Sequence, residues 1–379
     1  MRPWASGLDV ARGRPDLLRG RRYGLLTGGG AADRRLVPVA RVLTDVASRR
    51  PEVLFAPEHG TVGAQPPGQP ITDRDGSDAS PPLVSLYGAR TAPEPAHLTA
   101  IDCLVVDLSD VGVRYFTYLA TLRATLRACA GRVAVIVLDR GNPQGRRIDG
   151  PLMSDEFASQ VGIAGLPVLH GMTLGELARW CIGQDRIDVD LTVIAAPRWR
   201  GESLGGDRPW ISPSPNLGTR SAAHLYAGTC LFEAVAASEG RGTARPFEQF
   251  GAPGISGGAI VDAAGSLPGV LLQAVAFQPA TSNHQGVVCA GCCIHIVRPD
   301  LLRPLRVGLT LLRTVRRHFP EAFAWLPLRP GSPPWIDRLL GHPPTRDAID
   351  REGAFAFDDL WSEDLRAFEE SRAEYLLYG

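Results

Sequence analysis

The stretch IDCLVVDL, residues 101–108, decides the fold class, because it is an apolar run of the length of one strand. Runs of this kind occur where a strand is buried on both faces of a sheet. A second run, RVAVIVL at 132–138, follows a segment in which Leu119, Leu122 and Leu126 recur at helical spacing. Strand, helix and strand in this order predict a right-handed unit with parallel strands.

The same alternation extends through the first half of the chain. Shorter apolar runs predict further strands, and helical periodicity lies between them. The strands are expected at 22–26, 53–55, 83–87 and 191–195, and the helices at 36–46 and 173–182. Residues 61–82 are rich in Pro, Gly, Asp and Ser and predict a long loop. The pattern predicts an α/β fold with a Rossmann-like, doubly wound parallel sheet.

The pattern changes after residue 220. Helices are expected at 231–237, 305–315 and about 361–378, with a strand at 292–297 and a Gly/Pro-rich region at 240–290. This indicates a smaller α+β domain that follows the parallel sheet. We place the boundary near residue 222, which gives a Rossmann-like domain at 1–222 and an α+β C-terminal domain at 223–379.

The composition excludes several classes of function. Forty basic residues balance forty acidic ones, and every basic residue is Arg. A chain without Lys has no lysine Schiff base and no phosphate-binding Walker lysine. The neutral balance argues against a nucleic-acid partner, which needs a clustered basic surface. No cofactor is implied.

The chain also lacks the marks of a membrane or secreted protein. No apolar run approaches the ~20 residues of a membrane span, and the first residues contain no apolar signal segment. The seven Cys form no framework spacing, so free thiols in a reducing compartment are expected. Both points favour the cytoplasm.

Polar residues follow several of the predicted strands, and ligands of open parallel sheets bind at this edge. Glu58 and His59 follow the strand predicted at 53–55, in a turn bracketed by Pro57 and Gly60. We expect Glu58 to be a catalytic carboxylate and His59 to orient it or a ligand. A loop ion pair or a carboxylate at a helix N-terminus remains the structural alternative for Glu58.

The strand at 101–108 is followed by further candidates. Asp107 or Asp110 is expected to be the second carboxylate of a glycosidase or to anchor Arg114. Arg114 and Arg241 are candidates for holding a substrate carboxylate. Tyr115 and Tyr118 fit an apolar wall for a sugar, or core at the start of the next helix.

The remaining candidates come from other strand ends and from the second domain. They share a polar group at a Gly- or Pro-flanked turn, and each also has a plain structural explanation as a cap, turn, linker or ion pair. They are Asp139, Asn142, His170, Asn216 and Glu239. Glu176 belongs to a Thr-x-x-Glu capping box and is expected to be structural.

Two further patterns are weak. GGGAAD after the first strand does not match the dinucleotide fingerprint. Cys289, Cys292, Cys293 and His295 have zinc-like spacing, but they lie in a predicted strand, where alternate side chains point to opposite faces. We therefore expect no metal. A nucleotide-dependent α/β enzyme stays as a third reading of the fold.

Nine collinear motifs together resemble one protein family. They are LFAPEHG, SLYG, DLSDVGVRYFTYLATL, DRGNPQG, DGPLM, HGMTLGELA, SPSPN, GTCLFEAVAASEGRGTARPFEQFGAP and CAGCCIHIV. In this order, from Leu54 to about Val297, they are similar to the NamZ-type exo-β-N-acetylmuramidases of bacteria.

The resemblance implies a glycoside hydrolase of cell wall recycling. Such an enzyme removes N-acetylmuramic acid (MurNAc) from the non-reducing end of peptidoglycan fragments, so the expected partner is a MurNAc disaccharide or muropeptide. It implies a Rossmann-like catalytic domain, here 1–222, with Glu58 as the catalytic glutamate, and a smaller C-terminal domain, here 223–379, that closes the cleft. A second acidic role falls among Asp107, Asp110 and Asp149.

Four departures from the family's usual motifs motivate an alternative. Gly28, Gly141, Asp149 and Leu169 stand where family members usually have Asn, Pro, Glu and Arg. The alternative is a catalytically impaired, glycan-binding relative with altered substrate preference. The family also includes many members that look exported, whereas this chain shows no signal segment.

Overall fold

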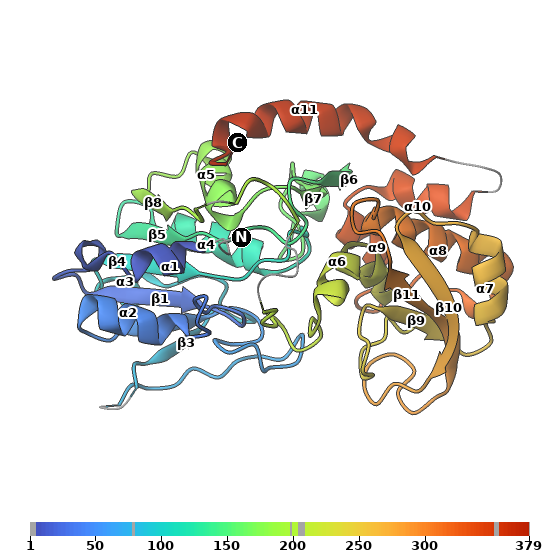
Figure 1. The fold of residues 1–379 in the computed structure, drawn as a ribbon, viewed down its shortest axis with the longest axis horizontal. Coiled ribbons are helices and arrows are strands. Elements are labelled where there is room, and N and C mark those ends of the chain that lie inside the picture. Colours follow the sequence, from blue (N-terminus) through green and yellow to red (C-terminus); the bar gives the residue numbers. More distant parts are fainter. Residues whose placement is uncertain (1–4, 78–79, 198, 204–208, 352–355, 379) are drawn as a thin grey trace.

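A computed structural model describes residues 5–77, 80–197, 199–203, 209–351 and 356–378. Two lobes lie side by side, and the N-terminal lobe contains the larger sheet (Figure 1). Its strands are β1 (Tyr23–Thr27), β2 (Val53–Ala56), β3 (Leu83–Ser85), β4 (Cys103–Asp107), β5 (Ala134–Leu138) and β8 (Leu191–Ile194). Its helices are α1 (Gly7–Ala11), α2 (Val39–Ala47), α3 (Pro95–Leu98), α4 (Tyr118–Cys129) and α5 (Leu174–Asp185).

The six strands form one parallel sheet in the order β3-β2-β1-β4-β5-β8. The order reverses direction at β1, as in a doubly wound Rossmann-like sheet. The α/β prediction is therefore confirmed. Every expected strand of this sheet is present, with bounds that differ by at most a few residues.

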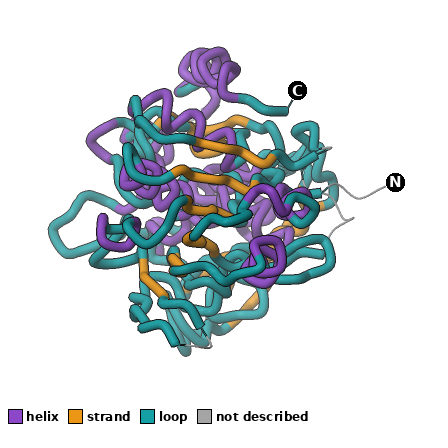
Figure 2. Tube along the Cα trace, turned by 90° about the vertical axis from the view of Figure 1, so that its left-hand side faces the viewer, coloured by secondary structure: helices purple, strands orange, loops and turns teal. Residues whose placement is uncertain are grey.

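Alternate side chains of the central strands enter two separate cores. Cys103 and Val105 pack with α1 and α2 on one face, whereas Leu104 and Val106 pack on the face covered by α4 and α5. Figure 2 shows the strands stacked with helices on both sides. Burial on both faces explains why these strands read as continuous apolar runs.

The sequence missed an antiparallel pair and a helix near the domain boundary. β6 (Ile148–Leu152) pairs with β7 (Pro167–His170), outside the main sheet. α6 (Arg220–Thr229) is capped by Thr219, whose side chain accepts a hydrogen bond from the backbone of Ala222. α6 runs into a 3₁₀ turn at Cys230–Ala234, where the sequence predicted a helix at 231–237.

The C-terminal lobe is α+β, as expected. Its sheet is antiparallel in the order β10-β11-β9. The strands are β9 (Gln249–Ala252), β10 (Val270–Phe277) and β11 (Cys289–Ile296), and the helices that follow α6 are α7 (Gly257–Ala264), α8 (Pro304–His318), α9 (Trp335–Leu340), α10 (Pro343–Asp350) and α11 (Ser362–Arg372). Within the described residues, no helix combines the length and apolarity that crossing a membrane requires.

One hydrophobic core continues from the N-terminal lobe into the C-terminal lobe, which fixes the two lobes against each other. Polar contacts reinforce this interface. The Gln144 side chain donates to the carbonyl of Ala223, and Arg303 and Arg306 of the C-terminal lobe lie 3.4 Å from the buried carboxylate of Asp149. Asp149 is therefore an interface ion-pair partner.

The C-terminal segment returns to the N-terminal lobe. α11 crosses from the C-terminal lobe towards α5, so that the chain ends beside the first lobe (Figure 1). Arg372 donates to the carbonyls of His170 and Gly171, and the backbone of Leu377 donates to Glu176. The tail thus holds the two lobes together from the outside.

Candidate active site

A cavity of about 590 Å³ opens between the lobes, within the size range of small-ligand sites. Its floor comes from the carboxyl end of β2 and the start of α4, and its roof comes from α6, the 3₁₀ turn that follows it, and α9. Its lining includes Glu58, His59, Tyr87, Tyr115, Phe116, Thr117, Gln160, Ser214, Asn216, Tyr226, Cys230, Glu233, Arg241, Phe247, Arg329, Trp335, Arg338 and Leu339.

A sharp turn after β2 delivers Glu58 to the floor. His59 adopts φ +71° and Gly60 φ +79°, so the chain reverses within two residues. The His59 ring is 2.9 Å from the carbonyl oxygen of Gln65, which secures this unusual backbone conformation. Burial lowers the pKa of His59. A neutral ring that holds the turn is the role this geometry supports.

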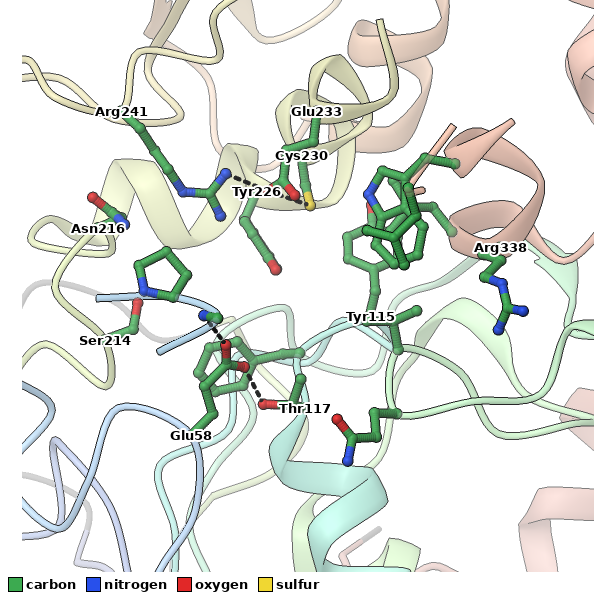
Figure 3. A pocket seen from close by; sticks show the side chains of 18 of the residues that line it. Glu58, Tyr115, Thr117, Ser214, Asn216, Tyr226, Cys230, Glu233, Arg241 and Arg338 are labelled. Carbon is green, nitrogen blue, oxygen red and sulfur yellow. Dashed lines mark hydrogen bonds and ion pairs between the residues drawn. The ribbon is translucent and has the colours of Figure 1, made fainter. Parts of the chain in front are cut away.

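Glu58 accepts hydrogen bonds from both sides of the cavity floor. The Gly68 backbone donates to Oε1 at 3.0 Å and the Thr117 hydroxyl donates to Oε2 at 2.8 Å (Figure 3). Tyr87 also lines the cavity, and burial, followed by the charge of the nearby Glu58, raises the pKa of the Tyr87 hydroxyl. The carboxyl group is held in one orientation and is 8% exposed.

The roof carries an acid-base cluster. Arg241 lies 2.6 Å from Glu233 and 2.8 Å from Glu239, and its guanidinium stacks 4.7 Å from the centre of the Phe247 ring. Burial opposes the charge of Arg241, but the two glutamates outweigh it and raise the pKa of Arg241. Burial also raises the pKa of Glu239. Arg241 is therefore occupied by the protein's own carboxylates.

Aromatic rings form the wall between floor and roof. Tyr115 and Tyr226 meet edge to face at 5.6 Å, and Phe116 contacts Tyr226 in the same way at 6.3 Å. The Tyr115 hydroxyl donates to the carbonyl of Ala227, which fixes the ring against α6. Asn216 lines the cavity on the side nearest Arg241 (Figure 3). Apolar walls with a few polar groups are suited to a sugar ring.

The structure does not bring Asp107 together with Glu58. Asp107 is fully buried and forms a two-pronged ion pair with Arg140, at 2.5 and 2.8 Å. Arg140 also donates to the carbonyl of Ala32. A carboxylate in this pair serves the packing of neighbouring strand ends. These contacts support a structural role for Asp107 in place of the expected catalytic one.

Asp110 and His170 lie together in the interior and do not line the cavity. Their closest atoms, Asp110 Oδ2 and His170 Nε2, are 3.8 Å apart, which is too long for a hydrogen bond. Burial raises the pKa of Asp110 to about 7 and lowers that of His170 to about 3, the latter with help from Arg372 and Arg114. The Gly112 backbone donates to Asp110. Both shifts disfavour an ion pair between these two buried side chains.

Arg114 also departs from its expected role. It is 1% exposed, and its guanidinium donates to four backbone carbonyls, two in each lobe. They belong to Pro151 and Leu166 in the first lobe and to Leu339 and Leu340 at the end of α9. Arg114 therefore joins the lobes and is not available to a substrate carboxylate.

The other expected ligands are structural in their contacts. Asp139 accepts from Thr173, Gly175 and Tyr378, which ties α5 and the C-terminal tail to the end of β5. Asn142 donates to the carbonyl of Met172. The Tyr118 hydroxyl donates to the carbonyl of Pro213, directly over Gly28. The Tyr118 side chain fills the space that a side chain at position 28 would need.

The cavity thus unites five of the predicted site residues and adds others. The five are Glu58, His59, Tyr115, Asn216 and Arg241. Glu239 supports Arg241 from behind. Sequence reasoning missed Thr117, Tyr87, Glu233 and Arg338. Thr117 and Glu233 lie inside the quoted motifs RYFTYL and CLFEAV, so their acidic or hydroxyl side chains were visible signals. Among the described residues, no three His, Cys, Asp or Glu side chains are arranged to hold a metal ion.

Comparison with known proteins assigns both lobes to one family. The model of the N-terminal domain of exo-β-N-acetylmuramidase NamZ matches residues 23–221, and the model of its C-terminal domain matches residues 224–378. The peptidoglycan β-N-acetylmuramidase NamZ of Bacillus subtilis (strain 168) is 34% identical over 370 residues, which cover 95% of this chain and 88% of that protein.

Two crystal structures share the architecture. Both are DUF1343 family proteins from Bacteroides fragilis NCTC 9343. Each is 26% identical to this chain, and each match covers 99% of both chains, with TM-scores of 0.88 and 0.74. The two-lobe architecture of this chain is therefore shared with both of these crystal structures.

Proposed function

Because this chain belongs to the NamZ family of exo-β-N-acetylmuramidases, we propose that it is a glycosidase that hydrolyses the β-glycosidic bond of a terminal MurNAc residue in peptidoglycan fragments. One observation carries the proposal. Glu58, an acidic residue held by two defined hydrogen bonds, lies on the floor of a sugar-sized cavity with aromatic walls.

We propose that Glu58 is the acid/base of the reaction. Cleavage of a glycosidic bond needs a proton on the leaving oxygen, and a carboxyl group held in a partly dry cavity supplies it. Thr117 and Gly68 fix the orientation of the carboxyl group, so that one oxygen does not rotate away from the bond that breaks. This positioning role explains why a threonine hydroxyl and a backbone amide converge on one carboxylate.

Among the described residues that line the cavity, Glu233 is the second glutamate. Its ion pair with Arg241 places a negative charge on the roof, across the cavity from Glu58 (Figure 3). The transition state of glycoside hydrolysis carries positive charge on the sugar ring, and a fixed carboxylate beside the ring stabilises it. We propose this electrostatic role for Glu233 in place of the one that the sequence assigned to Asp107 or Asp110.

The test is the release of MurNAc from the disaccharide MurNAc-β-1,4-N-acetylglucosamine. Glu58→Gln keeps the shape of the side chain but removes the proton that it donates, so kcat is expected to fall about 10²–10⁴-fold. Glu370→Gln makes the same chemical change at an exposed position on α11, which contributes no residue to the cavity lining, and is the matched control. Equal kcat values for wild type and Glu58→Gln would remove Glu58 from its role.

The impaired, glycan-binding alternative makes the opposite prediction for the wild type. It expects the disaccharide to bind, in calorimetry, without turnover during a long incubation. The comparisons do not favour this alternative, since the curated relative is named for the activity itself.

A further inference from the structure

The charges of the cavity are unevenly distributed. On the Arg241 side of the cavity, two carboxylates, those of Glu233 and Glu239, face one guanidinium. That region therefore repels a second anion. The substrate of the proposed function carries such an anion, because MurNAc differs from N-acetylglucosamine by a lactyl ether whose carboxyl group is ionised at neutral pH.

The two arginines that the sequence offered for this carboxylate are both occupied. Arg241 is held between Glu233 and Glu239, and the Arg114 guanidinium donates hydrogen bonds to four backbone carbonyls. A substrate carboxylate that took either one would have to break buried contacts. The anion must be recognised elsewhere in the cavity.

Arg338 has the properties that these two residues lack. It lies on α9 and lines the cavity, with Trp335 and Leu339 on the same helix. Its side chain is half-buried, and within the described chain it forms no hydrogen bond, ion pair or ring contact. The adjacent acid, Asp337, is buried and pairs with Arg346, so it does not neutralise Arg338.

Its position separates it from the acidic cluster. Figure 3 shows Arg338 on the opposite side of the cavity from Arg241 and Asn216, with the tyrosine wall between them. A sugar bound against this wall with its scissile bond near Glu58 would direct one substituent towards each side. If the lactyl group points towards Arg338, its carboxylate lies near a cation. If it points towards Arg241, its carboxylate lies near Glu233 and Glu239.

We propose that Arg338 is the specificity-determining residue that binds the lactyl carboxylate of the terminal MurNAc. This inference rests on the proposed function and deepens it by naming the recognised group. A guanidinium matches a carboxylate with two parallel hydrogen bonds, which a lysine at this position cannot reproduce.

Three other arginines in or near the cavity lack this combination of properties. Arg329 lines the same cavity but is exposed, so water competes for its guanidinium. Arg123 and Arg127 line an adjacent hollow of about 170 Å³, but both are paired with Asp185. Arg338 alone among these side chains combines partial burial with a free guanidinium in the described structure.

The experiment varies the charge on both partners. The substrates are 4-nitrophenyl β-N-acetylmuramide and its lactyl methyl ester, which keeps the shape but loses the charge. The variants are Arg338→Gln and Arg338→Lys, with Arg366→Gln on exposed α11 as a matched control. The wild type is expected to prefer the acid over the ester by about 10- to 100-fold in kcat/KM, the value of one charge-assisted contact.

Arg338→Gln is expected to reduce this preference to near one, mainly through KM, and Arg338→Lys to retain part of it. Arg366→Gln should match the wild type. A preference that is unchanged in Arg338→Gln overturns the inference. Calorimetry with free MurNAc and its methyl ester measures the same preference without turnover. A wild type that prefers MurNAc in calorimetry but releases no 4-nitrophenol thus contradicts the proposed hydrolysis and still supports the assignment of Arg338.

Discussion

Replacing Arg114 by methionine tests whether this side chain joins the lobes. Methionine has a similar length, but it donates no hydrogen bond. The change removes the hydrogen-bond donor from four backbone carbonyls. Outside the regular helices and strands, only the Leu166 carbonyl among these four accepts a second backbone hydrogen bond, from Met153. Two of the four lie at the end of α9, where helix carbonyls have no partner within the helix. The loss falls directly on the interface between the lobes.

The magnitude follows from these contacts. An unpaired buried polar group costs about 1–3 kcal/mol, and removing the buried charge returns part of that cost. A net loss of about 4 kcal/mol is therefore expected in the free energy of unfolding. For a chain of 379 residues the unfolding entropy is about 0.8 kcal/mol/K, so the melting temperature should fall by about 5 °C.

Differential scanning calorimetry measures the shift, and two variants frame it. Arg114→Lys keeps a charge and some hydrogen-bond donors but loses the planar guanidinium that reaches both lobes. Its melting temperature should therefore lie between those of wild type and Arg114→Met. Arg298→Met removes an arginine that is 62% exposed and paired with an exposed Asp300, so it should change the melting temperature by less than about 1 °C. An Arg114→Met protein that melts within 1 °C of wild type would refute the reasoning.

Two further predictions concern buried carboxylates. The folded pKa of Asp110, about 7, lies above its unfolded value of about 3.9, so wild-type stability falls as the pH rises through this window. The free energy of unfolding of Asp110→Asn, relative to that of wild type, should therefore increase by about 2–4 kcal/mol between pH 4 and pH 8. Melting curves whose difference does not change with pH would contradict this prediction. Tyr378→Phe removes the hydroxyl that donates to Asp139 and accepts from the Ala196 backbone, at a cost of about 1–3 kcal/mol. Carboxypeptidase should release its C-terminal residues faster than those of wild type, and an equal rate would show that the tail is held by other contacts.

The parallel sheet was predictable because its signal is local. A strand buried on both faces must be apolar at every position, and residues 103–107 and 134–138 meet this demand without reference to the rest of the chain. β6 was not predicted because its sequence carries no such local signal. Its sequence, IDGPL, contains Gly150 at φ +86° and a proline, and it acquires its strand conformation from pairing with β7.

The floor of the site was also predictable in part. Glu58 follows a buried strand and is bracketed by Pro57 and Gly60, so its turn is encoded within a few residues. The neighbouring strand ends were misleading because a polar residue at the rim of a sheet has two kinds of partner, a ligand or another rim residue. Asp107 pairs with the rim residue Arg140. The sequence does not give the side-chain directions that distinguish such a pair from a ligand-binding residue.

The roof could not be predicted because it depends on how the lobes dock. Arg338 and Glu233 lie more than 170 positions from Glu58 along the chain, and no local pattern marks either residue as facing it. α9 contributes to the docking of the lobes, because the carbonyls of its last two residues accept hydrogen bonds from Arg114. Arg338, which precedes these two residues on α9, lines the cavity. The residue that joins the lobes and the residue that we assign to the substrate carboxylate therefore meet on the same short helix. A loss of Arg114 should weaken MurNAc binding as well as stability, and calorimetry on the folded Arg114→Lys protein separates that effect from unfolding.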